Sequence, residues 1–139
     1  MPPVSYVEDN LAVLGDKEVP LANCTAAGSW PPAEVRWLTD SVAEKVHVKN
    51  NNYEHANGTT TTVSTLFGVP TREIYQQSVQ CVITGRALLK EETISFIIQV
   101  YCGYTNISLY HLLMELIFLL HLHHPFLVMV LVTVDGIQT

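Results

Sequence analysis

The sequence is poor in basic residues. Its 139 residues include seven Lys and Arg against thirteen Asp and Glu, which gives a formal net charge of −6. The seven basic residues are scattered along the chain. Nucleic-acid binding relies on a clustered basic patch, so this function class is excluded. The sequence also lacks a nucleophile–base motif, a phosphate-binding loop and an H-E-x-x-H pattern. We therefore expect no catalytic residues, no cofactor and no metal site.

A signal peptide is also missing from the first residues. MPPVSYVEDN has neither a basic start nor an apolar run. Three Asn-x-Ser/Thr sequons nevertheless favour a protein of the secretory pathway, with N-glycosylation predicted at Asn23, Asn57 and Asn106. We therefore expect the chain to be an internal part of a longer protein. Asn23 alternates away from its neighbour Cys24 along a strand, so its side chain is expected to face solvent.

Cysteine is scarce and odd in number. The three cysteines are Cys24, Cys81 and Cys102, so at most one internal pair can form and one thiol is left over.

The first hundred residues lack a helical repeat of apolar positions and instead show short alternating runs. Apolar residues recur at every second position in 33–37, 79–83 and 94–100, and 60–67 is rich in β-branched residues. The polar run 50–58 is expected to be a turn. Several strands at this spacing predict an all-β sandwich over residues 3–101.

The composition changes in the last third of the chain, and residues 102–139 are predicted to form a hydrophobic, helical tail. Residues 107–134 are long enough to cross a membrane, although Glu115, four histidines and Pro125 make insertion marginal. The favoured interpretation is that this tail is not part of the protein's native sequence. The alternative is a short membrane-anchored form. The histidines of 121–124 are interpreted as a chance run rather than a metal site.

The order Cys24, Trp37, Cys81 predicts the fold. In the immunoglobulin sandwich two cysteines bond across the core and a tryptophan packs on the bridge, and each of these residues lies in the apolar register of its strand. Two buried free thiols in a cytosolic β protein are the alternative. Val79 stands where a tyrosine usually precedes the second cysteine, which favours a constant-type (C1/C2-like) domain.

Longer sequence blocks add a family resemblance. CTAAGSWPPAEVRW, NGTTTTVSTLFGVPTRE and QQSVQCVITGRALLKEETISFIIQVY occur in the order found in the second extracellular immunoglobulin domain of the nectins, and the resemblance covers about residues 3–101. The most distinctive pieces are residues 57–59 and 69–73. After Tyr101 the sequence departs from the family pattern, which continues into a third immunoglobulin domain.

The resemblance implies a non-enzymatic fragment of an adhesion receptor at the plasma membrane and at cell–cell junctions. Other nectin-like receptors would be its partners in cis or in trans, through calcium-independent contacts. In this family the second domain acts chiefly as a spacer and is implicated in lateral association, which makes a homodimer an expectation. An immune-type receptor or soluble decoy of the same superfamily is the alternative function. A structural β-sandwich with no recognition role is a third.

Overall fold

The computed structural model describes residues 1–102 and residue 116. Residues Met1–Tyr101 form one compact unit. The predicted membrane segment 107–134, the sequon at Asn106 and the histidines of 121–124 lie outside the described residues, apart from Leu116. Within the described part of the chain, no helix has the length and apolar character needed to cross a membrane.

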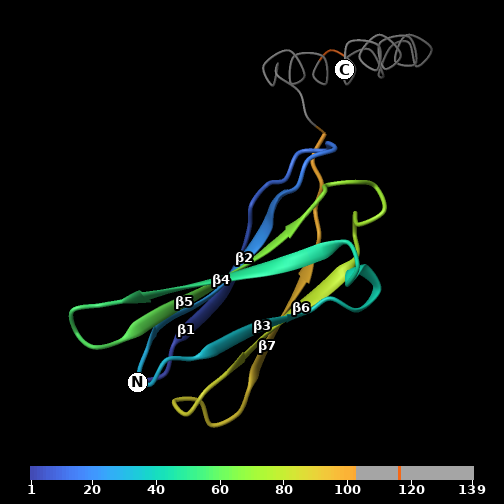
Figure 1. Cartoon of the computed structure of the whole chain (residues 1–139). Coiled ribbons are helices and arrows are strands. Elements are labelled where there is room, and N and C mark those ends of the chain that lie inside the picture. The colour runs from blue at the N-terminus through green and yellow to red at the C-terminus, as the bar shows by residue number, and fades with distance from the viewer. Residues whose placement is uncertain (103–115, 117–139) are drawn as a thin grey trace. The chain divides into compact units, whose positions relative to one another are not determined.

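Two antiparallel sheets make up this unit (Figure 1). The four-stranded sheet has the order β1-β2-β5-β4, and the three-stranded sheet has the order β3-β6-β7. This is the strand arrangement of a constant-type immunoglobulin sandwich. The predicted all-β immunoglobulin-like sandwich is therefore confirmed. The bounds are β1 Val4–Asp9, β2 Val19–Ser29, β3 Glu34–Leu38, the 3-10 helix η1 Asp40–Val42, β4 Val46–Glu54, β5 Thr60–Gly68, β6 Ser78–Thr84 and β7 Glu92–Ile97.

Alternating burial along the strands forms the core between the two sheets. On β3, Val35 and Trp37 are buried while Glu34, Arg36 and Leu38 are exposed. β5 alternates between buried and half-buried residues over its whole length. Because successive strand residues point to opposite faces, this alternation places one side of each strand in the core and the other in water.

Strand β2 departs from the simple alternation expected for it. Leu21 is fully buried although the sequence pattern placed it on the face opposite Ala22 and Cys24. The register of β2 against β5 shifts between Pro20 and Ala22, and such an irregularity re-aims the side chains next to it. Leu21 therefore joins the core.

Strand β4 is longer than the sequence indicated. The turn expected over 50–58 is wrong for residues 50–54, which continue β4 and pair with β5 as far as Glu54. All residues of β4 after Val46 are exposed, because this strand is the edge of its sheet and the three-stranded sheet does not cover it.

Candidate functional site

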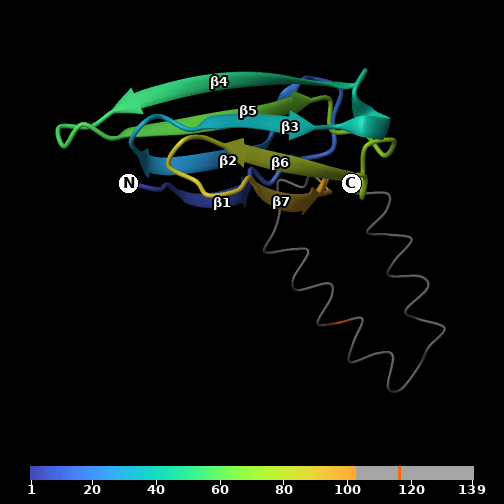
Figure 2. The ribbon, with the colours of Figure 1, turned by 90° about the horizontal axis from the view of Figure 1, so that it is seen from below.

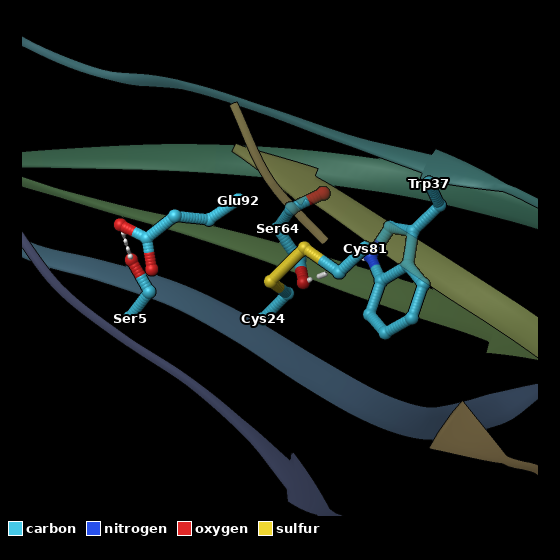
Figure 3. Close-up of a disulfide and its surroundings, with 6 residues drawn as sticks. All are labelled: Ser5, Cys24, Trp37, Ser64, Cys81 and Glu92. Carbon is cyan, nitrogen blue, oxygen red and sulfur yellow. Dashed lines mark hydrogen bonds between the residues drawn. A yellow bond between two sulfur atoms is a disulfide. The ribbon is translucent and has the colours of Figure 1, made fainter. Parts of the chain in front are cut away.

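The disulfide joins the two sheets at the centre of the core. Cys24 on β2 and Cys81 on β6 are bonded with a Cα–Cα distance of 6.4 Å, and both are fully buried. Trp37 on β3 pairs in register with Cys81, and its indole N–H donates to the backbone carbonyl of Ser64 on β5 at 3.3 Å (Figure 3). The bond closes a loop with a sequence separation of 57 residues. Loop-closure entropy assigns about 4 kcal/mol to such a cross-link.

The hydroxyl of Ser64 lies in the same region of the core, beside the disulfide (Figure 3). Ser64 is fully buried, and its Oγ has no hydrogen-bond partner among the residues that the structure describes. Sequence reasoning could not single out Ser64, because a serine in a threonine-rich strand has nothing to distinguish it until the inner face of the strand is known.

Two of the three predicted glycosylation residues lie in the described unit, in different surroundings. Asn57 is exposed in the turn between β4 and β5, where its Oδ1 accepts hydrogen bonds from the backbone N–H and the hydroxyl of Thr59. Asn23 lies on β2, half-buried, and its Oδ1 accepts a hydrogen bond from Asn10 at 3.2 Å. Asn23 thus lies on the outer side of its strand but is half-buried instead of fully solvent-facing, and its sequon residue Thr25 is only 5% exposed.

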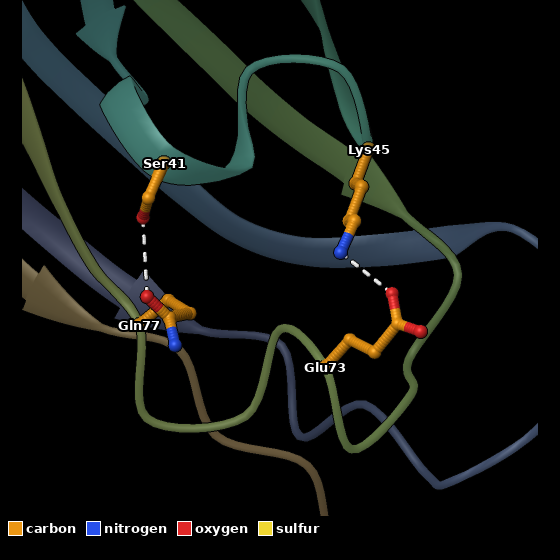
Figure 4. A network of polar contacts seen from close by, with 4 residues as sticks. All are labelled: Ser41, Lys45, Glu73 and Gln77. Atoms are coloured by element: carbon orange, nitrogen blue, oxygen red, sulfur yellow. Dashed lines mark hydrogen bonds and ion pairs between the residues drawn. The ribbon is translucent and has the colours of Figure 1, made fainter.

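A polar network connects two loops at one end of the sandwich (Figure 4). Lys45, just before β4, donates to Glu73 at 2.6 Å, and Ser41 in η1 donates to Gln77 at 3.1 Å. The hydrogen bond from Lys45, with its charge, lowers the pKa of Glu73 below its usual range. Glu73 ends the distinctive 69–73 block, so the structure gives this block a local role in joining the β3–β4 and β5–β6 connections.

The chain enters and leaves the unit at opposite ends of the sandwich (Figures 1 and 2). The amino group of Met1 donates to the carbonyl of Trp30, and the N–H of Trp30 donates to the carbonyl of Met1, both at 3.0 Å. At the other end Tyr101 donates its N–H to the carbonyl of Ala12 at 2.8 Å and its hydroxyl to Asp9 at 2.6 Å. The hydrogen bond to Asp9 raises the pKa of Tyr101.

A polar groove of about 350 Å³ runs between the free edges of β3 and β4. Its ionisable lining groups are Glu34 and Arg36, without a histidine or cysteine beside them, so the groove has no nucleophile–base pair. Over the same 1–102 stretch, no three His, Cys, Asp or Glu side chains converge as metal ligands would. Cys102 is exposed and unpaired within the described chain. The groove is lined by Ala33, Glu34, Val35, Arg36, Asn50, Asn52 and Thr62.

Comparison with known proteins gives a family match over most of the compact unit. The model of the CD80-like C2-set immunoglobulin domain family matches residues 3–92. Nectin 1b of Danio rerio is 31% identical over 71 residues, which is 51% of this chain and 13% of that protein. The chain thus corresponds to a small part of this relative.

Solved structures share the fold. The crystal structure of the full ectodomain (Ig1–Ig3) of mouse nectin-like molecule 4 matches with a TM-score of 0.57 and 24% identity, over 71% of this chain and 34% of that chain. The crystal structure of Rst D1-D2 matches with a TM-score of 0.56 and 20% identity, over 71% of this chain and 49% of that chain. At these identities the likeness concerns the sandwich alone.

Proposed function

Because the chain belongs to the CD80-like C2-set immunoglobulin domain family and is nectin-like in sequence, we propose that it is part of an adhesion receptor. Its immunoglobulin unit spaces neighbouring parts of the receptor and associates laterally with other copies. The partners are nectin-like receptors, and the site of action is the extracellular side of the plasma membrane at cell–cell contacts. No chemistry is assigned to the unit, which acts by binding.

The position of the two chain ends carries the spacer proposal. The Met1–Trp30 contact lies at one end of the sandwich and the Tyr101–Asp9 contact at the other. The longest strand, β2, has 11 residues, which correspond to about 36 Å at the usual rise per residue. A module entered at one end and left at the other adds that length between whatever precedes and follows it. It can therefore hold a recognition surface away from a membrane.

The character of the groove between β3 and β4 favours an association role over capture of a small molecule. The groove between β3 and β4 is open and lined by polar side chains, unlike the enclosed, mostly apolar sites that hold small molecules. In nectins, which this chain resembles, a variable-type domain recognises the partner on the opposing cell, and we assign that recognition to such a domain and not to this unit. This unit then contributes contacts between receptors on one surface.

Vesicles carrying the full chain test this division of roles. The chain is attached to lipid vesicles through a C-terminal tag, and two dye-labelled populations are mixed on one vesicle. We expect energy transfer between copies on the same vesicle and no clustering of vesicles. Clustering would show recognition between opposing surfaces and would refute the spacer role. An absence of energy transfer at high surface density would refute lateral association.

A further inference from the structure

The outer face of the four-stranded sheet has an acid at one edge and a base at the other, in the same row of residues. The pairing registers align Glu8 on β1 with Asn23 on β2, Asn23 with Thr65 on β5, and Thr65 with Lys49 on β4. Their neighbours Cys24 and Ser64 are fully buried, so this row points away from the core. Glu8 and Lys49 are both exposed.

We propose that this face binds the same face of a second copy of the chain, with both copies pointing in the same direction. The inference rests on the proposed lateral association and names its surface. A two-fold axis parallel to the strands exchanges the two edges of the sheet, so that β1 of each copy stacks over β4 of the other while the rows stay aligned. Glu8 of each copy then faces Lys49 of the other. The interface is isologous, so this ion pair occurs twice.

The neighbouring row fits the same arrangement. Tyr6 on β1 aligns with Thr25, Thr25 with Val63, and Val63 with Asn51 on β4. The two central residues are short, and Thr25 is only 5% exposed, whereas Tyr6 is 41% exposed at the edge. This row is thus low in the middle and higher at its β1 edge, which leaves room for a second sheet stacked at about 10 Å over it. The phenol of Tyr6 covers the exposed Asn51 of the other copy.

The charges also decide the direction of the second copy. In an antiparallel stack the two-fold axis crosses the strands, so β1 lies over β1 and β4 over β4. Glu8 then has no Lys49 opposite it in any register of the two faces. His47, the other basic residue on the outer side of β4, already pairs with Glu18 at 3.1 Å and stacks on Phe67. Only the parallel stack pairs both edge charges, and parallel copies are what two receptors on one membrane present to each other.

The size of the face predicts a weak dimer. The outer strands β1 and β4 are three strand spacings apart, or about 14 Å, and β1 has six residues. An area of this kind belongs to the low end of specific interfaces. We expect a dissociation constant in the micromolar range that rises with salt, because the two ion pairs are exposed and screened.

Charge reversal on the full chain tests the surface. The protein is produced without glycans, the Cys24–Cys81 bond is verified, and sedimentation equilibrium is measured in density-matched detergent micelles. We expect Glu8→Lys or Lys49→Glu to raise the dimer dissociation constant by about tenfold or more, because each replaces two attractions with two repulsions. The double variant should return to within about threefold of the original. Glu34→Lys, on the outer side of the other sheet, is the matched control and should change nothing.

Rescue in the double variant is the decisive result. Glu8 and Lys49 lie at opposite edges of one sheet, so restored association cannot arise from a contact within one copy. If the chain dimerises and the single reversals leave the dissociation constant unchanged, this surface is wrong while lateral association stands. If the single variants weaken the dimer and the double variant does not recover, the facing of Glu8 and Lys49 is wrong. A chain that remains monomeric at high micromolar concentration overturns the surface and the lateral role together.

Discussion

Replacing Ser64 with alanine should stabilise the protein, although the substitution removes a core atom. The serine is fully buried on the inner side of β5, and its Oγ finds no partner in the described chain. A buried hydroxyl without a partner costs about 1–3 kcal/mol. Ser64→Ala removes this cost and loses only the packing of one oxygen. Its backbone carbonyl, which accepts the Trp37 hydrogen bond, remains in place. The expected net gain is about 1 kcal/mol in the free energy of unfolding.

A second hydroxyl on the same face of β5 provides the matched control. Thr62 is 5% exposed, and its Oγ1 donates to the carbonyl of Ala33 at 3.3 Å, so this hydroxyl is paired. Thr62→Val keeps the shape of the side chain and leaves that carbonyl without its donor. We expect a loss of about 1 kcal/mol. The two substitutions should therefore shift stability in opposite directions.

The assay is urea unfolding of the full chain, followed by the fluorescence of Trp37. Trp30 is 62% exposed, and Trp30→Phe in every protein of the series leaves Trp37 as the reporter. With a slope of about 1–3 kcal/mol per molar urea, a change of 1 kcal/mol moves the midpoint by a few tenths molar or more. A lower midpoint for Ser64→Ala than for its parent would mean that the hydroxyl is paired in the native protein, and the reasoning would fail.

Three further predictions concern the surface. The hydrogen bond to Asp9 raises the pKa of Tyr101 above its ordinary 10.0. The stability from this contact should therefore be present below pH 10 and lost as the pH rises through the raised value. Tyr101→Phe should flatten the alkaline limb of a plot of the urea-unfolding midpoint against pH. The hydrogen bond from Lys45 lowers the pKa of Glu73 from its ordinary 4.5. The stability from this contact should therefore be present above pH 4.5 and lost as the pH falls through the lowered pKa. Glu73→Gln should flatten the acid limb of the same plot. In glycosylating cells Asn57 should carry a glycan, because its side chain is exposed in a turn; peptide mass spectrometry before and after deglycosylation measures occupancy, and an unmodified Asn57 would contradict the prediction.

The part of the fold that the sequence predicted is the part in which one side of a strand is buried and the other is not. Trp37 and Cys81 could be placed from the sequence because buried residues recur at every second position of β3 and of β6 as far as Cys81, although Val82 is buried as well, and the two residues pair in register. The polar half of β4 was missed for the same reason. Asn52 and its neighbours are exposed on both sides of an edge strand, so no alternation of polarity marks them as extended.

The proposed association face was less predictable than the fold, because it depends on the pairing register of four strands. Glu8 and Lys49 are 41 positions apart in the sequence, and nothing local relates them. They fall in one row only because β1 pairs with β2, β2 with β5 and β5 with β4 at particular offsets. A one-residue slip of either edge strand would move its charge to the inner face.

Asn23 connects the glycosylation and association hypotheses, because it lies in the same row as Glu8 and Lys49. A glycan on its side chain would stand between two faces that must approach to about 10 Å, so the modification and the proposed dimer exclude each other in one molecule. The folded structure opposes the modification: Asn23 is half-buried, its Oδ1 accepts from Asn10, and Thr25 is held in the β2 ladder at 5% exposure. We therefore expect lower glycan occupancy at Asn23 than at the exposed Asn57.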